Sequence, residues 1–213
     1  MKMLPLTEAE NSIMSAKSLL AAICVGLGLV TMLSWRDQAR AGGNMLFPAE
    51  IDAVVDGAKL KLVRTGSAFR KSAGFKVYAV ASYLGKDIKL QTAEQLAHAD
   101  QPKRLELVFL LNVAGDEMAA AFRTIIRQNY PEPAFADEVK MLTSLFEKTA
   151  AKKGDHVWIT HIPKVGLHCR REGKEELLIR NVEFSKAVWD NYLGENNCGE
   201  AVKRGLISEL ARQ

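Results

Sequence analysis

The segment Phe75–Leu84 constrains what this chain can fold into more than any other feature of its sequence. It reads FKVYAVASYL, and alternate positions of an extended strand project to opposite faces of a sheet. Both sets of alternate positions are largely apolar, so removal of both faces from water is favourable. We therefore expect a central strand that is covered on both sides.

Neighbouring segments carry further strand patterns. Ala49–Val55 and Leu60–Val63 flank Asp56-Gly57, a dipeptide typical of tight turns, and are expected to form a hairpin. Arg104–Leu111, which reads RLELVFLL, is expected to be another strand with one apolar face. A capping-box pattern that begins at Thr92 predicts a short helix through about residue 99.

The hydrophobic period changes from strand to helix after Gly115. Apolar residues recur at helical spacing from Asp116 up to Pro131, and again from Ala136 to Ala150. Three short strand patterns and two further helical patterns follow. This succession of sheet, helices, sheet and helices is typical of an α+β fold. The expected later elements are strands at His156–Ile162, Val165–Cys169 and Leu177–Ile179, and helices at Phe184–Tyr192 and Val202–Leu210.

The N-terminal region has the layout of a secretory signal. Leu19–Leu33 is an uncharged apolar run, preceded by Lys17 and followed by the A-x-A sequence Ala39-Arg40-Ala41. The run is short for a membrane-spanning helix, which needs about 20 apolar residues, although residues 34–35 could extend it. Residues 1–41 are therefore expected to be a cleaved signal peptide or an uncleaved membrane anchor through residues 19–35. Residues 42–213 are expected to form one domain.

Composition and motifs exclude several functional classes. The net charge of +4 comes from 29 basic and 25 acidic residues that are interleaved, without the basic stripe of a nucleic-acid-binding protein. The sequence has no glycine-rich dinucleotide or phosphate-binding motif in its predicted domain and no G-x-S-x-G hydrolase element, so we expect no cofactor. The 3 cysteines are too few for a disulfide framework, and whether Cys169 and Cys198 pair stays open.

A group of histidines is the one candidate metal site. His156, His161 and His168 lie close together in the sequence with Cys169. Metal ligands must converge, but His156 and His161 are an odd number of residues apart on one predicted strand and face opposite sides. His161 and His168 could still oppose each other across a hairpin. We expect solvent-facing strand histidines and no metal site.

The region Gly66–Leu84 carries the main candidate for a binding site. Arg70 precedes the strand that is apolar on both faces, and Tyr78 and Tyr83 lie within that strand. A guanidinium beside an apolar cavity suits a carboxylate or phenolate, because its planar fork makes paired charge-assisted hydrogen bonds. The residues alone leave a second interpretation open, in which Arg70 is a solvated turn residue and Tyr78 a core residue with a satisfied hydroxyl.

A succession of short motifs runs from about Phe47 to Leu210. A G-x-x-x-R turn leads into KVY-x-A-x-YL, followed by KRLELVFL, the helix pair, KKGD before a strand, and a closing F-x-x-A-x-x-x-x-YLG helix. In order and spacing these motifs resemble the chalcone isomerase-like family, in its bacterial secreted branch. The resemblance implies an open-faced sandwich, an antiparallel sheet packed on a layer of helices with a ligand cleft between them. With the N-terminal signal, it implies a periplasmic or secreted protein, or one anchored to the inner membrane.

The resemblance also implies a division between isomerases, which close chalcones into flavanones, and non-catalytic relatives, some of which bind fatty acids. Both groups have an arginine at the head of the long strand, and Arg70 matches it. The isomerases have a threonine in that strand, where this chain has Tyr78. They have a tyrosine and an asparagine on a following helix, where this chain has Glu117 or Met118 and then Thr124. Loss of one transition-state donor typically costs about 100-fold to 1,000-fold in rate, so these departures disfavour catalysis.

We therefore expect a non-catalytic binder of a fatty acid or a similar amphipathic carboxylate. Arg70 would hold the head group with help from Tyr78 or Tyr83, and Thr124 is a further candidate at the site. One alternative is an isomerase, an intramolecular lyase that acts on a chalcone-like or other flavonoid-like enone. Another is a structural or interaction protein whose cleft is vestigial.

Overall fold

The computed structural model describes residues 46–55, 57–173 and 176–212. The predicted signal or anchor at residues 1–41, and Asp56 of the predicted hairpin turn, lie outside the described residues. Among the helices within these ranges, none combines the length and apolar character needed to cross a bilayer.

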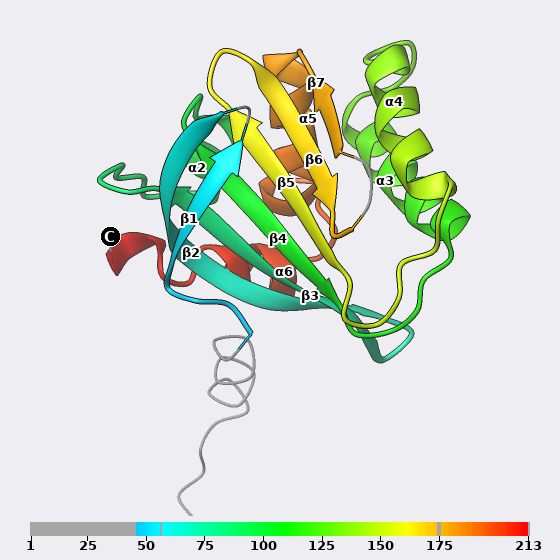
Figure 1. The fold of residues 1–213 in the computed structure, drawn as a ribbon, viewed down its shortest axis with the longest axis horizontal. Coiled ribbons are helices and arrows are strands. Elements are labelled where there is room, and N and C mark those ends of the chain that lie inside the picture. Colours follow the sequence, from blue (N-terminus) through cyan, green and yellow to red (C-terminus); the bar gives the residue numbers. More distant parts are fainter. Residues whose placement is uncertain (1–45, 56, 174–175, 213) are drawn as a thin grey trace, which may run out of the picture. The chain divides into compact units, whose positions relative to one another are not determined.

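One seven-stranded antiparallel sheet forms the framework, and its strands neighbour each other in chain order (Figure 1). The longest pairing joins β2 to β3 through a hairpin at which Ser72 is opposite Phe75. The strands are β1 (Glu50–Val55), β2 (Ala58–Ser72), β3 (Phe75–Gly85), β4 (Lys103–Phe109), β5 (His156–Ile162), β6 (Gly166–Arg171) and β7 (Glu176–Ile179).

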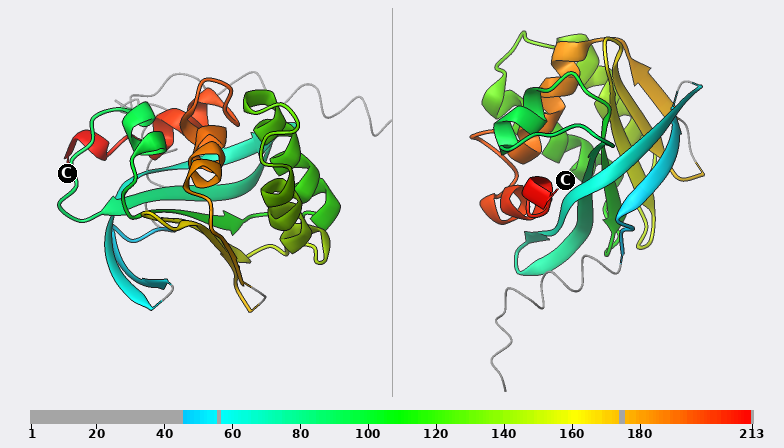
Figure 2. Two further views of the ribbon diagram at one scale, coloured as in Figure 1. Left: turned by 90° about the horizontal axis from the view of Figure 1, so that it is seen from above. Right: turned by 90° about the vertical axis from the view of Figure 1, so that its left-hand side faces the viewer.

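The helices lie together on one face of this sheet (Figure 2). The sheet is curled, and its other face forms a trough between β1 and the strands β5 to β7 (Figure 2). This arrangement confirms the predicted α+β class, an open-faced sandwich of an antiparallel sheet and a helical layer. The helices are α2 (Ala93–His98), α3 (Gly115–Asn129), α4 (Ala136–Glu147), α5 (Val182–Leu193) and α6 (Glu200–Leu206), followed by the 3-10 turn η1 (Leu210–Arg212).

Two hydrophobic clusters cover the two faces of β3. Val80 and Leu84 are fully buried in the larger cluster, which lies between the sheet and the helices. Ala81 and Tyr83 are fully buried in a smaller cluster on the other face, to which Ala53 of β1 also belongs. The prediction of a central strand covered on both sides is confirmed.

The segment Gly66–Ser72 is a continuation of β2, where the sequence predicted a turn before Arg70. The strand pairing is irregular next to Gly66, and α6 packs directly on the strand at this point. A Cβ atom added to Gly66 would lie 2.1 Å from the carbonyl oxygen of Gly205. Gly66 therefore allows α6 to pack closely on β2. Arg70 is a strand residue, so its side chain projects to one particular face of the sheet.

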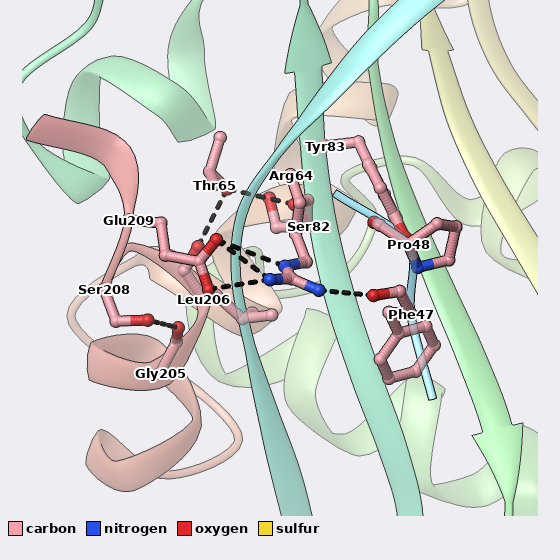
Figure 3. Close-up of polar contacts among 10 residues, drawn as sticks. All are labelled: Phe47, Pro48, Arg64, Thr65, Ser82, Tyr83, Gly205, Leu206, Ser208 and Glu209. Carbon is pink, nitrogen blue, oxygen red and sulfur yellow. Dashed lines mark hydrogen bonds and ion pairs between the residues drawn. The ribbon is translucent and has the colours of Figure 1, made fainter. Parts of the chain in front are cut away.

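A polar network fixes the C-terminal residues to β2 (Figure 3). The guanidinium of Arg64 lies 3.2 Å from the carboxylate of Glu209 and also donates to the carbonyl of Phe47. The hydroxyl of Thr65 donates to the carbonyl of Leu206 at 2.8 Å. Because Leu206 ends α6, these contacts set the position of α6 and of the loop that precedes it.

The histidines divide between the two faces of the sheet. Nδ1 of His156 lies 3.0 Å from Glu106 on the trough side, whereas Nδ1 of His161 lies 2.8 Å from Ser185 of α5. The opposite orientation predicted for His156 and His161 is confirmed. The expectation of solvent-facing histidines is wrong for His161 and His168, which are buried because α5 covers the first and the curled sheet encloses the second. His168 pairs with Thr160, so it does not oppose His161.

Candidate functional site

A pocket of about 340 Å³ lies between the sheet and the helices α3 and α5. Its apolar wall consists of β4 and α3 side chains, among them Phe109, Met118 and Phe122. Phe122 stacks on Phe146 of α4 with ring centroids 4.9 Å apart, which fixes this wall from behind. A polar wall comes from β2, β3, α5 and the loop after α5, and it consists of Arg70, Tyr78, Asn191, Tyr192 and Cys198.

Arg70 lies near the end of β2, directly opposite Tyr78 in the β2–β3 ladder. Its side chain is half-buried, and Nη1 donates to the carbonyl of Lys71 at 2.8 Å. A Cβ atom on Gly199 would lie 3.9 Å from Nη1, so the guanidinium reaches the loop between α5 and α6. No acidic side chain among the described residues forms an ion pair with Arg70. Its positive charge is therefore available to an anionic ligand.

The hydroxyl and thiol groups beside Arg70 are neutral at physiological pH. Burial raises the pKa of Tyr78 and of Tyr192, and it raises the pKa of Cys198 to about 11. The nearby charge of Arg70 opposes this shift at Tyr78 and Cys198 without cancelling it. The two tyrosine hydroxyls and the thiol can therefore donate hydrogen bonds beside the positive charge of Arg70. None of them is an anion that would neutralise that charge.

Asn191 of α5 is a site residue that the sequence reasoning missed. It is buried and lines the pocket, and both atoms of its side-chain amide lack a hydrogen-bond partner among the described residues. Its backbone carbonyl accepts a hydrogen bond from the amide of Cys198 at 2.7 Å, which holds the loop after α5 beside it. The sequence does contain a sign of this residue. Asn191 is at helical spacing from Phe184 and Val188, so a polar residue stands on a face of α5 where an apolar one would be expected.

Two predicted site residues lie outside this pocket. Tyr83 is an odd number of residues from Tyr78 on the same strand, so it faces the smaller cluster and its hydroxyl donates to the carbonyl of Pro48 at 3.2 Å. Thr124 is exposed on α3 and does not line the pocket, whereas Glu117 and Ile125 of the same helix do. Of the predicted residues, the structure brings together Arg70 and Tyr78.

The cysteines and histidines form no alternative site in the part of the chain that the structure describes. Cys169 and Cys198 are both buried and unbonded to each other. No group of three His, Cys, Asp or Glu side chains within the described ranges could hold a metal ion.

Comparison with known proteins agrees with this architecture. A family model described as chalcone isomerase-like matches residues 44–208. Among solved structures, that of a fatty-acid binding protein from Arabidopsis thaliana superposes with a TM-score of 0.55 and 14% sequence identity, covering 76% of this chain and 100% of the other. At this identity the likeness shows the shared fold. No curated protein sequence matches the chain.

Proposed function

The chain belongs to the chalcone isomerase-like family, and we propose that it is a non-catalytic member that binds a fatty acid or a similar amphipathic carboxylate in the pocket between sheet and helices. In this proposal Arg70 binds the carboxylate, and Tyr78 and Asn191 donate further hydrogen bonds. The β4 and α3 side chains enclose the acyl chain.

One observation carries the proposal. The pocket combines a half-buried guanidinium that has no acidic partner among the described residues with a buried amide whose two polar atoms are both unpaired. Burial of a polar group without a partner typically costs about 1 to 3 kcal/mol. A carboxylate that enters this wall can accept a hydrogen bond from Nδ2 of Asn191, which removes part of that penalty, and it gains a charge-assisted hydrogen bond from Arg70.

The pocket's size indicates the kind of ligand. Its volume of about 340 Å³ is near the lower end of the range of about 300 to 1,000 Å³ that is usual for small-molecule sites. Phe109, Met118, Phe122 and Ile125 form most of the wall opposite the polar groups and offer no hydrogen bonds, although Asn112 and Glu117 also line the pocket. We therefore propose an acyl chain of medium length with one polar end.

The isomerase alternative receives less support from the same geometry. Ring closure requires donors placed where the ketone oxygen becomes negative. By the resemblance, Glu117 or Met118 stands where the isomerases have a tyrosine; both residues line the pocket from α3, and neither has a hydroxyl group. Arg70, Tyr78 and Asn191 suffice to bind an anion but leave the α3 side of the pocket without a donor.

The direct test is to titrate the purified full-length chain with sodium dodecanoate and, separately, to add a chalcone. The proposal expects saturable binding of one dodecanoate per chain and no chalcone loss above the spontaneous rate. Absence of dodecanoate binding would contradict the proposal that the protein binds fatty acids. Chalcone turnover that disappears in Arg70→Gln would establish the isomerase instead.

We also propose that the protein acts outside the cytoplasm, which the apolar run at Leu19–Leu33 and the A-x-A sequence at residues 39–41 support. Sequencing the N-terminus of the protein recovered from cells tests this proposal. A new N-terminus near residue 42 indicates a cleaved signal, whereas an intact N-terminus with membrane-bound protein indicates an anchor. Intact protein found only in the cytoplasm would contradict it.

A further inference from the structure

A second cleft lies on the opposite face of the sheet from the pocket. It has a volume of about 320 Å³ and lies between β1 and the strands β4 to β6, within the trough that Figure 2 shows. Ile51 and Ala53 of β1 lie along one side. Across from them lie Arg104 and Glu106 of β4, Trp158 of β5, and His168 and Arg170 of β6.

Strand register places these polar side chains in two rows. Arg104 is opposite Thr160, which is opposite His168, so one row crosses three strands. In the next row Glu106 is opposite Trp158, which is opposite Arg170. Directly opposed residues of an antiparallel pair have Cβ atoms about 4.5 to 5.5 Å apart and share a face. Both arginines therefore project into the trough from neighbouring rows.

Each arginine contacts a neutral side chain of β5. Nε of Arg104 donates to the hydroxyl of Thr160 at 2.8 Å, and the guanidinium of Arg170 lies 5.3 Å from the ring of Trp158. Among the described residues no Asp or Glu forms an ion pair with either arginine. Burial lowers the pKa of Arg104, the nearby carboxylate of Glu106 opposes this shift, and the charge of Arg170 adds to it.

The acidic groups around the cleft are paired with histidines or exposed. Glu106 is paired with His156 at 3.0 Å, and Glu176 of β7 is paired with Nε2 of His168 at 3.3 Å. Asp52 also borders the cleft from β1, but its side chain is exposed. Arg104 is partly buried and Arg170 is exposed, and together they place two guanidinium groups around a cleft whose one partly buried lining carboxylate is that of Glu106.

His168 also lines the cleft with a ring nitrogen that has no hydrogen-bond partner among the described residues. Its side chain is 10% exposed, it lines the cleft, and Nδ1 has no hydrogen-bond partner among the described residues. Polar atoms that are buried in this way are nearly always paired with protein, water or ligand. With Nε2 donating to Glu176, Nδ1 of neutral His168 is an unused acceptor at the cleft, and it would pair with a donor group of a ligand, whereas the guanidinium groups offer N–H donors.

We propose that this cleft is a second binding site, for a small organic anion that carries a carboxylate or phosphate group on a compact apolar body. Arg104 and Arg170 bind the anionic group, because the forked guanidinium matches both carboxylate and phosphate oxygens. The ring of Trp158 and the side chains of Ile51 and Ala53 contact the apolar body. The site is separate from the pocket, since strands β3 and β4 lie between the two and the cleft shares no residue with it.

The experiment uses benzoate and phenyl phosphate as probes on the full-length chain. Binding is followed by calorimetry and by the indole N–H signal of Trp158 in NMR spectra, assigned with Trp158→Phe. We expect saturable binding that shifts this signal. Arg170→Gln should weaken the affinity by about tenfold to 100-fold, the usual effect of losing a hydrogen bond to a charged group. Arg170 is exposed and forms no side-chain hydrogen bond within the described chain, so this variant should fold.

Arg180→Gln is the matched control, because Arg180 is exposed and lines neither the pocket nor the cleft. The affinity of the Arg180→Gln variant for both probes should equal that of the wild type. Arg104→Gln should weaken binding in the same way as Arg170→Gln. Absence of saturable binding overturns the proposal, as does an affinity that is unchanged in Arg170→Gln. Probe binding that is lost in Arg70→Gln while Arg170→Gln retains it would place the anion in the pocket and also overturn the second site.

Discussion

Arg70 and Tyr78 are directly opposite each other in the antiparallel ladder of β2 and β3, and both side chains line the pocket beneath the helices. The register gives the cation and the hydroxyl one shared face, because opposed residues of neighbouring strands project to the same side of a sheet. The contact between Gly66 and Gly205 fixes β2 against α6 on the same stretch of strand. The polar wall of the pocket is thus built on paired strands, which hold its donors in fixed positions.

The first prediction concerns Arg70. Arg70→Gln removes the positive charge of the polar wall and keeps a similar length, so dodecanoate should bind about tenfold to 100-fold more weakly. Thermal unfolding of the free protein should change little, since the guanidinium makes one hydrogen bond within the described ranges, to the neighbouring carbonyl of Lys71. Calorimetric titration measures the affinity, with Arg180→Gln as the control for loss of an arginine. Equal affinities in the two variants would remove Arg70 from the site.

The second prediction separates binding from stability at Asn191. Asn191→Leu replaces two unpaired buried polar atoms by apolar ones, so the free energy of unfolding of the free protein should stay equal or rise by about 1 kcal/mol. Dodecanoate affinity should fall, because the head group loses the amide. Urea unfolding and titration of the same preparation give both values. A loss of stability of about 3 kcal/mol or more would show instead that the amide is structural.

The third prediction uses two neighbouring alanines of α3. Ala121 lines the pocket, whereas Ala120 is exposed and does not. Ala121→Trp should place an indole at the pocket and weaken dodecanoate binding, with a smaller effect on a shorter acid such as hexanoate. Ala120→Trp should bind both acids like the wild type. If both variants bind dodecanoate normally, the acyl chain does not follow the α3 wall.

The fourth prediction is a pH dependence of stability that arises from Lys103. This side chain is fully buried, and Nζ donates to the carbonyls of Leu96 and Ala97 at 2.7 and 2.5 Å. Burial lowers the pKa of Lys103 to about 7, whereas an unfolded lysine titrates near about 10.4. Between these values the unfolded chain holds a proton that the folded chain has released, so stability rises with pH.

The expected slope from this one group approaches about 1.4 kcal/mol per pH unit above pH 7. Urea unfolding of the wild type and of Lys103→Met between about pH 7 and pH 8.5 measures it as the difference between the two proteins. Above that range the buried thiols of Cys169 and Cys198 act in the opposite direction, because burial raises the pKa of each, to about 12 and about 11. If the free energy of unfolding depends on pH in the same way in both proteins, Lys103 does not titrate as a buried group in this range.

Much of the fold follows from local patterns. The alternation in Phe75–Leu84 predicted β3 almost to the residue, and the capping box at Thr92 predicted α2, whose first turn is closed by a bond from Gln95 to the Thr92 hydroxyl. Such features depend on neighbours in the sequence. The length of β2 did not follow, because Gly66 is typical of a turn but here makes room for a helix that comes much later in the chain.

The site was predicted less completely for the same physical reason. The sequence predicts Arg70 and Tyr78 together, and both line the candidate pocket, but Tyr83 lies on the opposite face because of its odd spacing from Tyr78. Asn191 shares the pocket with Arg70 only through the packing of α5 against the sheet. The cleft with Arg104 and Arg170 depends on the curl of the sheet, which no local pattern in the sequence encodes.

The most direct test of the account is a crystal structure of the protein with dodecanoate bound. The account predicts the carboxylate within hydrogen-bond distance of Arg70 and Asn191, with the acyl chain along Phe109, Met118 and Phe122. A carboxylate that lies in solvent away from Arg70, or a pocket that stays empty at saturating dodecanoate, would contradict it.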